Sequence, residues 1–381
     1  MLTKKAGKIL FLIVFCMLLL IPAVSLNREV YVVSDMDNRV LTYPPEFDLH
    51  DLDALMANIN YYVNDRIGFR EFVLSSYQII EDKLFHYLVH PLYEYGKDDW
   101  IMTKEWDPVQ TFHLDLEEGY ADRFGSFIKE AQEVSQEYGA DFMFWLITNK
   151  ETVYPEYMSA GYNFKDQETK SDKMLHALAK RDIPYLYLLP TFQDLKETVQ
   201  LYNIKSDPGH WNEYGAMRGN MALVDFLRTQ FGANVEPLSP DEFDLTYEVE
   251  EYLLQSKLRI DEVTPHYILK EQKYTYPDTV FWEENGNRLI EFKEAPTLTE
   301  NAEAGDAPRL LIIGDSYMHF ESVYLGNHFS SICVVHSREV SNLRQYLELY
   351  HPDLVIIEAG ERVTGPDYGY FMDDVLEGGI L

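Results

Sequence analysis

Two kinds of residue are scarce in this sequence, and each scarcity excludes a class of protein. The 381 residues include only two cysteines, Cys16 and Cys333, so neither a disulfide framework nor a cysteine-type metal site is expected. Basic residues are also few: 32 Lys and Arg face 64 Asp and Glu, and the formal net charge is −32. Because phosphate backbones bind clustered Lys and Arg, we expect no nucleic-acid partner. We find no nucleotide-binding loop or metal-ligand cluster, so we expect no cofactor.

The long apolar run at the N-terminus predicts a targeting element. Lys4, Lys5 and Lys8 precede an apolar stretch at 9–26, so the charges should stay in the cytoplasm and the rest of the chain should be exported. The run is nearly long enough to span a bilayer, and its end, Ala23-Val24-Ser25, is an acceptable cleavage site. Residues 1–26 are therefore a signal anchor, which we slightly favour, or a cleaved signal peptide. We expect the remainder at the extracytoplasmic side of the cell membrane, or secreted after cleavage.

The main part of the chain has the pattern of an α/β protein. Beyond residue 100, continuous apolar runs of strand length alternate with segments of helical period. Such strands are buried on both faces, so the pattern predicts a doubly wound parallel sheet flanked by helices. The expected strands are 142–147, 184–189, 310–313, 332–335 and 354–357, and the expected helices are 116–138, 171–180, 213–231 and 340–350.

Two regions depart from this alternation. Residues 27–95 are expected to form an N-terminal helical segment, because apolar residues recur at helical spacing over 49–63 and again over 69–85. Residues 240–308 are acidic and aromatic, with short alternating pieces, and predict a partly β insertion. We therefore expect a main domain over 96–381 that contains this insertion.

One strand end carries the candidate nucleophile. The apolar run 310–313 ends abruptly at Gly314-Asp315-Ser316, and a helix-compatible stretch follows. Open α/β sheets form their sites at the carboxyl ends of strands. Backbone N–H groups of a following helix would lie beside the serine and could receive negative charge. Ser316 is therefore the candidate nucleophile for reaction at an ester, although a structural turn with the serine as a helix cap has the same sequence.

A candidate general base, and a carboxylate that could orient it, lie about a hundred residues earlier in the chain. Asp207-Pro208-Gly209-His210 leads into a helix whose N-cap we expect at Asn212. His210 would remove the serine proton, and Asp207 would hold the imidazole in one tautomer. Asp207 could instead cap the turn, because Asp-Pro-Gly is a good turn sequence. His319, one helical turn after Ser316, is an alternative base.

Several short segments occur in a characteristic order: 38–41, 61–70, 95–101, 149–155, 207–211, 314–317 and 361–362. Together they resemble the SGNH-hydrolase superfamily, and specifically the alginate-type polysaccharide O-acetyltransferases of the DHHW type. Asp and His before Ser fit this group rather than ordinary SGNH esterases. The family usually has one residue between Asp and His, whereas Pro208 and Gly209 intervene here, and the broader superfamily commonly has two.

The resemblance implies an SGNH-like sheet and an exported O-acetyltransferase. Its acetyl group would pass through Ser316 to hydroxyls of a cell-envelope or secreted polysaccharide, with His210 and Asp207 completing the catalytic set. By the same resemblance, a separate membrane-bound O-acyltransferase supplies the acetyl group. Candidates for contacts to the substrate or oxyanion are Tyr317, Asn149 and Arg338, each of which could equally be structural.

Two other functions remain open. An SGNH-type carbohydrate acetyl esterase would use the same three residues with water as acceptor. A non-catalytic polysaccharide-binding or assembly protein would not depend on the Ser316 hydroxyl. Replacement of Ser316 by Ala separates the last function from the other two.

Overall fold

The computed structural model describes residues 4–34, 39–45, 47, 50–104, 116–159, 168–277 and 296–365. The chain divides into two compact units. We call residues 1–94 with 250–261 the N-terminal unit, and residues 95–249 with 262–381 the sheet unit. The N-terminal unit therefore takes in a short piece of the segment expected as an insertion.

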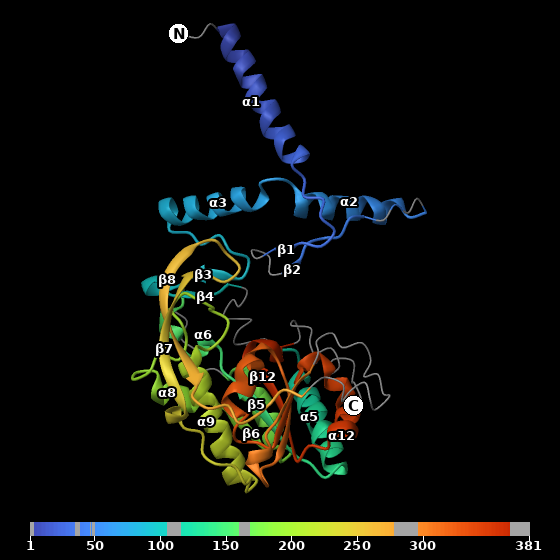
Figure 1. Cartoon of the computed structure of the whole chain (residues 1–381), viewed down its shortest axis with the longest axis vertical. Helices are drawn as coiled ribbons and strands as arrows, with labels where there is room; N and C mark the ends of the chain where they lie inside the picture. Colours follow the sequence, from blue (N-terminus) through green and yellow to red (C-terminus); the bar gives the residue numbers. More distant parts are fainter. Residues whose placement is uncertain are drawn as a thin grey trace. The chain divides into compact units, whose positions relative to one another are not determined.

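A six-stranded sheet forms the centre of the sheet unit (Figure 1). Neighbouring strands are parallel, except that the edge strand β9 runs antiparallel to β11. The strand order confirms the predicted α/β class and its mostly parallel sheet. In this order, the strands are β6 (Tyr185–Tyr187), β5 (Asp141–Ile147), β12 (Leu354–Gly360), β10 (Arg309–Gly314), β11 (Ser331–His336) and β9 (Thr297–Glu300).

Helices cover both faces of this sheet because the strands alternate apolar side chains between two cores. Leu311 and Ile313 of β10 belong to one core, and Leu310 and Ile312 belong to the other. The first core is closed by α5 (Tyr120–Glu137), α7 (Lys170–Ala179) and α12 (Leu343–Tyr350). The second is closed by α8 (Leu189–Leu195), α9 (Glu213–Gln230) and α11 (Glu321–Leu325). Both faces are thus covered, as the continuous apolar strands predicted.

Some elements differ from the sequence-based expectation. The segment after Ser316 begins as a 3₁₀ turn, η5 (Ser316–Phe320), and becomes α-helical only in the short α11. The expected strand 184–189 is shorter, because α8 begins at Leu189. The partly β insertion is present as the strands β7 (Phe243–Tyr252) and β8 (Arg259–Leu269), which pair with each other, together with β9. The expected strand piece at 274–281 forms a single bridge, between Thr275 and Glu300, and its end lies outside the described residues.

The described residues of the N-terminal unit include the helices α1 (Lys4–Val24), α2 (Leu52–Arg66) and α3 (Arg70–Phe85). By length and composition, α1 could cross a membrane, and none of its residues is buried. The helices α2 and α3 confirm the helical periodicity of the N-terminal segment.

The remaining strands are short: β1 (Val33–Ser34), β2 (Arg39–Val40), β3 (Tyr93–Tyr95) and β4 (Ile101–Thr103). The short helical turns are α6 (Lys150–Val153), η1 (Lys97–Asp99), η2 (Pro155–Tyr157), η3 (Pro240–Glu242), η4 (Ala302–Ala304), η6 (Ser337–Asn342) and η7 (Glu361–Thr364).

Candidate active site

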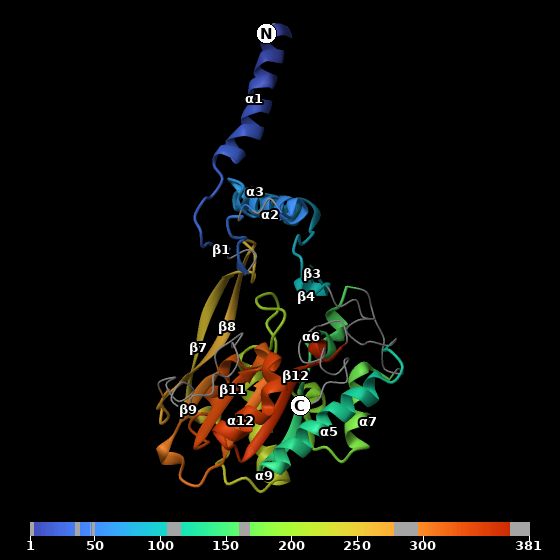
Figure 2. The ribbon, with the colours of Figure 1, turned by 90° about the vertical axis from the view of Figure 1, so that its right-hand side faces the viewer.

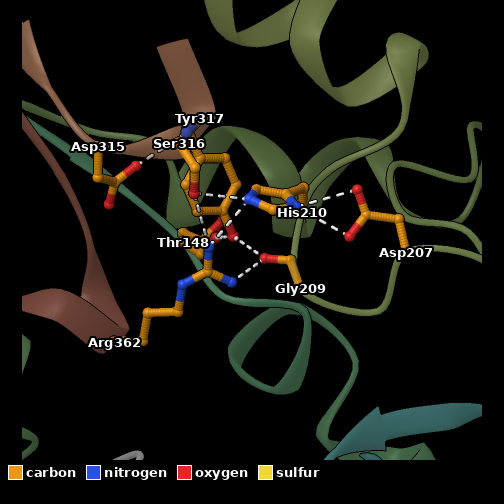
Figure 3. A network of polar contacts seen from close by, with 8 residues as sticks. All are labelled: Thr148, Asp207, Gly209, His210, Asp315, Ser316, Tyr317 and Arg362. Carbon is orange, nitrogen blue, oxygen red and sulfur yellow. Dashed lines mark hydrogen bonds and ion pairs between the residues drawn. The ribbon is translucent and has the colours of Figure 1, made fainter. Parts of the chain in front are cut away.

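Three residues predicted as a catalytic set meet at the carboxyl edge of the sheet (Figure 3). Ser316 follows β10, whereas His210 and Asp207 lie in the loop before α9. His210 Nε2 is 2.7 Å from Ser316 Oγ, and His210 Nδ1 is 2.8 Å from Asp207 Oδ1. A carboxylate only accepts hydrogen bonds, so Nδ1 carries the proton and Nε2 is free to accept the serine proton. The two-residue spacer between Asp and His is thus compatible with direct contact.

The electrostatics of this set keep the carboxylate charged. Burial of the Asp207 carboxyl raises its pKa, but the positive charge of His210, the hydrogen bond from His210 and the charge of Arg362 act in the opposite direction. The net effect is that the pKa of Asp207 lies below its usual value. Asp207 therefore stays ionised near neutral pH and can stabilise an imidazolium at His210.

An arginine that follows the neighbouring strand β12 joins this set. Arg362 Nη2 lies 3.1 Å from His210 Nε2 and donates to Ser316 Oγ at 3.3 Å. Its Nη1 donates to the Gly209 carbonyl, and its guanidinium stacks 5.0 Å from the centre of the Tyr317 ring. The guanidinium thus places a fixed positive charge beside the serine hydroxyl. Arg362 was not among the predicted site residues, although it lies in the segment 361–362 that carried the family resemblance.

The aspartate of the Gly-Asp-Ser turn ties β10 to β12. The Asp315 carboxylate accepts the backbone N–H groups of Tyr317 and Gly360, each at 2.9 Å. The Asp315 N–H donates to Glu358 Oε2 at 2.9 Å. The approach is so close that a Cβ on Gly314 would lie 2.5 Å from Glu358 Oε2. The turn that presents Ser316 is therefore held by the neighbouring strand, and a glycine is required at its start.

The donors beside Ser316 differ from those that the sequence predicted. We expected several helix N–H groups, but the turn after Ser316 is 3₁₀ and the Tyr317 N–H is bonded to Asp315. Within the described part of the chain, the Ser316 N–H has no hydrogen-bond partner in the protein. The candidate donors beside the Ser316 oxygen are therefore the Ser316 N–H and Arg362 Nη2, which donates to Oγ at 3.3 Å.

The other predicted contact residues have different surroundings. Tyr317 is buried, its ring contacts His210 edge-on, and its hydroxyl donates to Gly209 at 3.0 Å and to Thr148 at 3.4 Å. Asn149 is buried as well, and its Oδ1 accepts the Arg362 N–H at 3.4 Å. Both residues thus support the site from within the protein.

Arg338 lies after β11, with its side chain exposed and its N–H bonded to His336 Nδ1. Among the residues drawn around Ser316, the arginine is Arg362 (Figure 3). The side chain of the alternative base, His319, lies outside the described residues.

The loop that carries His210, residues 204–212, is held from both sides by β8. Glu262 accepts the N–H groups of Ile204, Lys205 and Ser206 at 2.6–2.7 Å, just before Asp207. Such a run of N–H groups forms an anion-binding nest. Asp207 itself has a φ of +35°, a backbone conformation that this nest helps to hold. Glu262 lies in the acidic insertion, and nothing in its local sequence distinguishes it from the neighbouring acidic residues.

The other side of the loop is held through the start of α9. Asn212 caps this helix, as predicted, by accepting the Gly215 N–H at 3.0 Å. The next residue, Glu213, accepts the Tyr267 N–H at 2.5 Å and contacts His266 Nδ1 at 2.8 Å. The hydrogen bonds before and after the His210 loop thus both come from the same strand, β8.

A buried lysine also holds the start of this loop, by hydrogen bonds to backbone carbonyls. Lys150 Nζ donates to the carbonyls of Ile101 at 2.6 Å and Ile204 at 3.0 Å. Burial lowers the pKa of Lys150 to about 8, while the nearby carboxylates Glu151, Glu262 and Asp207 act in the opposite direction. Among the described residues, no group of three or more His, Cys, Asp or Glu side chains is placed to hold a metal ion.

A mostly parallel α/β sheet with Ser, His and Asp in contact at its carboxyl edge is the arrangement expected for the SGNH-hydrolase class. The family model for the SGNH hydrolase-like domain of the acetyltransferase AlgX matches residues 94–329, more than half of the chain. The chain therefore belongs to this AlgX-type family of SGNH hydrolase-like acetyltransferases. The match contains Asp207, His210 and Ser316 but ends before Arg362.

Solved structures share the fold at low sequence identity. Bacillus cereus PatB1 with a sulfonyl adduct is 15% identical, with a TM-score of 0.55, and the match covers 72% of this chain and 97% of that chain. A DHHW family protein from Eubacterium siraeum is 13% identical, with a TM-score of 0.52, and the coverages are 76% and 95%. No curated protein sequence matches the chain.

Proposed function

We propose that the protein is an exported O-acetyltransferase that moves an acetyl group, through an acetyl-serine at Ser316, onto hydroxyls of a cell-envelope or secreted polysaccharide. The observation that carries this proposal is the direct contact of Ser316 Oγ with His210 Nε2, backed by Asp207 on the other ring nitrogen. Membership of an acetyltransferase family supports an acetyl group as the transferred unit.

The first half-reaction loads the serine. Ser316 Oγ attacks the carbonyl carbon of the acetyl donor while His210 Nε2 takes the hydroxyl proton. The tetrahedral intermediate then collapses, its bond to the donor oxygen breaks, and His210 returns the proton to that leaving oxygen. The donor leaves as an alcohol, and the acetyl group stays on Ser316 as an ester.

The second half-reaction unloads the serine onto a sugar. A sugar hydroxyl attacks the acetyl carbonyl while His210 takes its proton, and the bond to Ser316 Oγ then breaks. His210 gives the proton to Oγ, which restores the free serine. Asp207 stays ionised throughout, in keeping with its lowered pKa, and stabilises the imidazolium each time it forms.

Arg362 and the Ser316 N–H are the groups that we assign to the negative oxygen of both tetrahedral intermediates. Arg362 Nη2 is already within hydrogen-bond distance of Oγ, so a small movement reaches an oxygen on the attached carbon. One donor of this kind is typically worth about 3 kcal/mol of activation free energy. A charged guanidinium also stabilises the serine oxygen as it loses its proton.

The cellular setting is part of the same proposal. We infer that α1 anchors the protein to the cell membrane, with the sheet unit on the extracytoplasmic side. Three lysines at the start of the chain and the apolar length of α1 support this orientation. We further propose that a membrane-bound O-acyltransferase supplies the acetyl group. The acceptor would be a polysaccharide.

The experiment uses the detergent-solubilised full chain with an activated acetyl ester, with and without an oligosaccharide acceptor. We expect an acetylated peptide that contains Ser316, followed by acetyl transfer to the oligosaccharide, and neither in the Ser316→Ala variant. Release of acetate alone, with no acetylated sugar, would show an esterase. Unchanged acetylation of the cell's polysaccharide in the Ser316→Ala strain would show a non-catalytic protein.

A second variant tests the role of Arg362 independently of Ser316, His210 and Asp207. Arg362→Met should keep His210 next to Ser316 but lose the positive charge, and we expect kcat to fall by roughly 10²- to 10³-fold. Arg228→Met, at an exposed arginine on α9, is the matched control. Equal losses in the two variants would contradict the role given to Arg362.

A further inference from the structure

Two helices of the N-terminal unit present apolar stripes that the unit does not cover. On α2, Leu52 and Met56 are 60% and 64% exposed, and Val63 continues the same helical face at 39%. On α3, the spacing of three and four residues places four exposed apolar side chains on one face. They are Val73, Tyr77, Ile80 and Leu84, and the exposed Phe72 lies at the edge of this face.

The opposite face of α3 is the one that packs on its own unit. Gln78, on the side of the helix opposite Ile80, is the buried residue of this helix. Its Nε2 donates to the Val89 carbonyl at 3.0 Å, and its Oε1 accepts from Ser256 at 3.3 Å. The unit therefore holds α3 by its polar side and leaves the apolar side outward, which is the reverse of an ordinary surface helix.

The joint between the two helices is fastened to the end of α1. The Gly68 N–H donates to the Pro22 carbonyl at 3.0 Å, and the Asn27 N–H donates to the Arg66 carbonyl at 2.9 Å. Gly68 is so close to α1 that an added Cβ would lie 2.4 Å from Ser25 Cβ. Figures 1 and 2 show α2 and α3 following one another across this end of α1.

The end of α1 that meets this joint is the end remote from the three lysines. If α1 crosses a bilayer, as in the proposed function on which this inference rests, that end lies at the extracytoplasmic surface. The hydrogen bonds then hold α2 and α3 at the level where the bilayer begins. Apolar and aromatic side chains on one side of a helix, with polar side chains on the other, are what such an interface accommodates.

We propose that α2 and α3 lie in the surface of the lipid bilayer that α1 spans, with their apolar stripes among the lipids. Tyr77 then adds an aromatic side chain to the membrane interface, where such side chains are favoured. Lys83 lies beside this stripe on α3 and can extend its charge to the lipid headgroups. The acidic residues Glu71 and Asp82 are on the other side and stay in water. In this arrangement α1 anchors the N-terminal unit in the membrane, and α2 and α3 lie parallel to the membrane surface.

The test uses the full chain reconstituted into vesicles of phosphatidylcholine and phosphatidylglycerol. Cys16 is an exposed cysteine within α1, and Cys333 is buried, so a spin label on the natural chain reports α1. With Cys16 replaced by Ser, single cysteines are placed at Met56, Val73, Ile80 and Leu84 on the stripes, and at Asn58 and Glu71 as matched controls. Collisions with oxygen and with a water-soluble nickel chelate measure the depth of each label.

We expect the stripe labels to be about 5–10 Å below the headgroup boundary, with an oxygen-to-nickel ratio several-fold above that of the control labels. Stripe labels as accessible to nickel as the controls would overturn the proposal. Stripe labels shielded from both reagents would overturn it as well, because another protein surface would then cover the helices. The label at Cys16 separates the two ideas: if it lies in water, the anchor fails, whatever the stripes show.

Discussion

The sheet unit and the N-terminal unit use the same apolar residue types in opposite ways. In the sheet unit, Leu310, Ile312 and Ile356 are completely buried between the sheet and its helices. In the N-terminal unit, Phe72 and Leu84 are 70% and 71% exposed on helices of equally regular period. Hydrophobic periodicity therefore predicts the element correctly in both units but does not say what covers it. Protein covers the apolar side chains in one unit, and we propose lipid in the other.

The largest effect that we expect belongs to the sheet unit and changes activity alone. Asp207→Asn should lower kcat for acetyl transfer by roughly 10⁴-fold, because an amide does not hold the same imidazole tautomer or stabilise the imidazolium. Asp225→Asn, at an exposed site on α9, is the control and should keep its activity. Similar activity in the two variants would show that His210 works without Asp207.

A pair of isoleucine substitutions tests the comparison directly. Ile312→Ala removes a side chain that is 0% exposed and should lower the free energy of unfolding by about 4 kcal/mol. Ile80→Ala, at a side chain that is 51% exposed, should cost less than about 0.5 kcal/mol. Chemical denaturation of the full chain in detergent, followed by circular dichroism, measures both. A loss at Ile80 as large as that at Ile312 would mean that protein covers the α3 stripe.

The hydrogen bonds from Glu262 to the His210 loop should contribute less to the free energy of unfolding than the buried side chains of the core. Glu262→Gln replaces a carboxylate that accepts three N–H groups by an amide that presents only one acceptor oxygen. We expect the free energy of unfolding to fall by about 2 kcal/mol, and kcat to fall because Asp207 and His210 lose their position. Glu248→Gln, exposed on β7, controls for the loss of a negative charge. An unchanged kcat in Glu262→Gln would show that the nest is structural only.

The smallest effect is a dependence of stability on pH. The pKa of Lys150 falls from 10.5 to about 8 on folding, so the unfolded chain binds more protons between these values. The contribution of this group to stability therefore rises with pH over that window, by up to about 1.4 kcal/mol per pH unit. Urea unfolding between about pH 8 and pH 9 should show this rise in the natural chain and not in Lys150→Met. Parallel curves for the two chains would contradict the assignment.

Much of the fold follows from the sequence because the sheet strands are short, continuous and apolar. The segments 310–313 and 354–357 were predicted as strands and lie side by side in β10 and β12. The long strands β7 and β8 were not resolved beforehand, because most of β7 is exposed and only Thr264 and Pro265 of β8 are buried, so neither strand has a continuous buried apolar face. The edge strand β9 was also missed, since only four residues pair with β11.

The residues of the candidate site also fall into two groups: those that the sequence predicted and those that only the structure shows. Ser316, His210 and Asp207 could be predicted because each stands in a short motif with its own chemistry, and the structure brings them into contact. Arg362 and Glu262 could not be assigned a place, because their partners are 46 and more than 50 residues away in the chain. Arg338 stays a predicted substrate contact. Both arginines follow strand ends, and only the strand order shows that β12, which precedes Arg362, lies between β5 and β10.

By itself, the sequence determined the α/β class, the helical N-terminal segment, the apolar N-terminal run and the three candidate catalytic side chains that the structure brings into contact. Each of these depends on local residue type and period. Only the tertiary structure decided that Arg362 lies beside Ser316, that β8 holds the His210 loop, and that α2 and α3 leave their apolar stripes outward. Those features depend on which distant segments meet, and that is set by the packing of the whole chain.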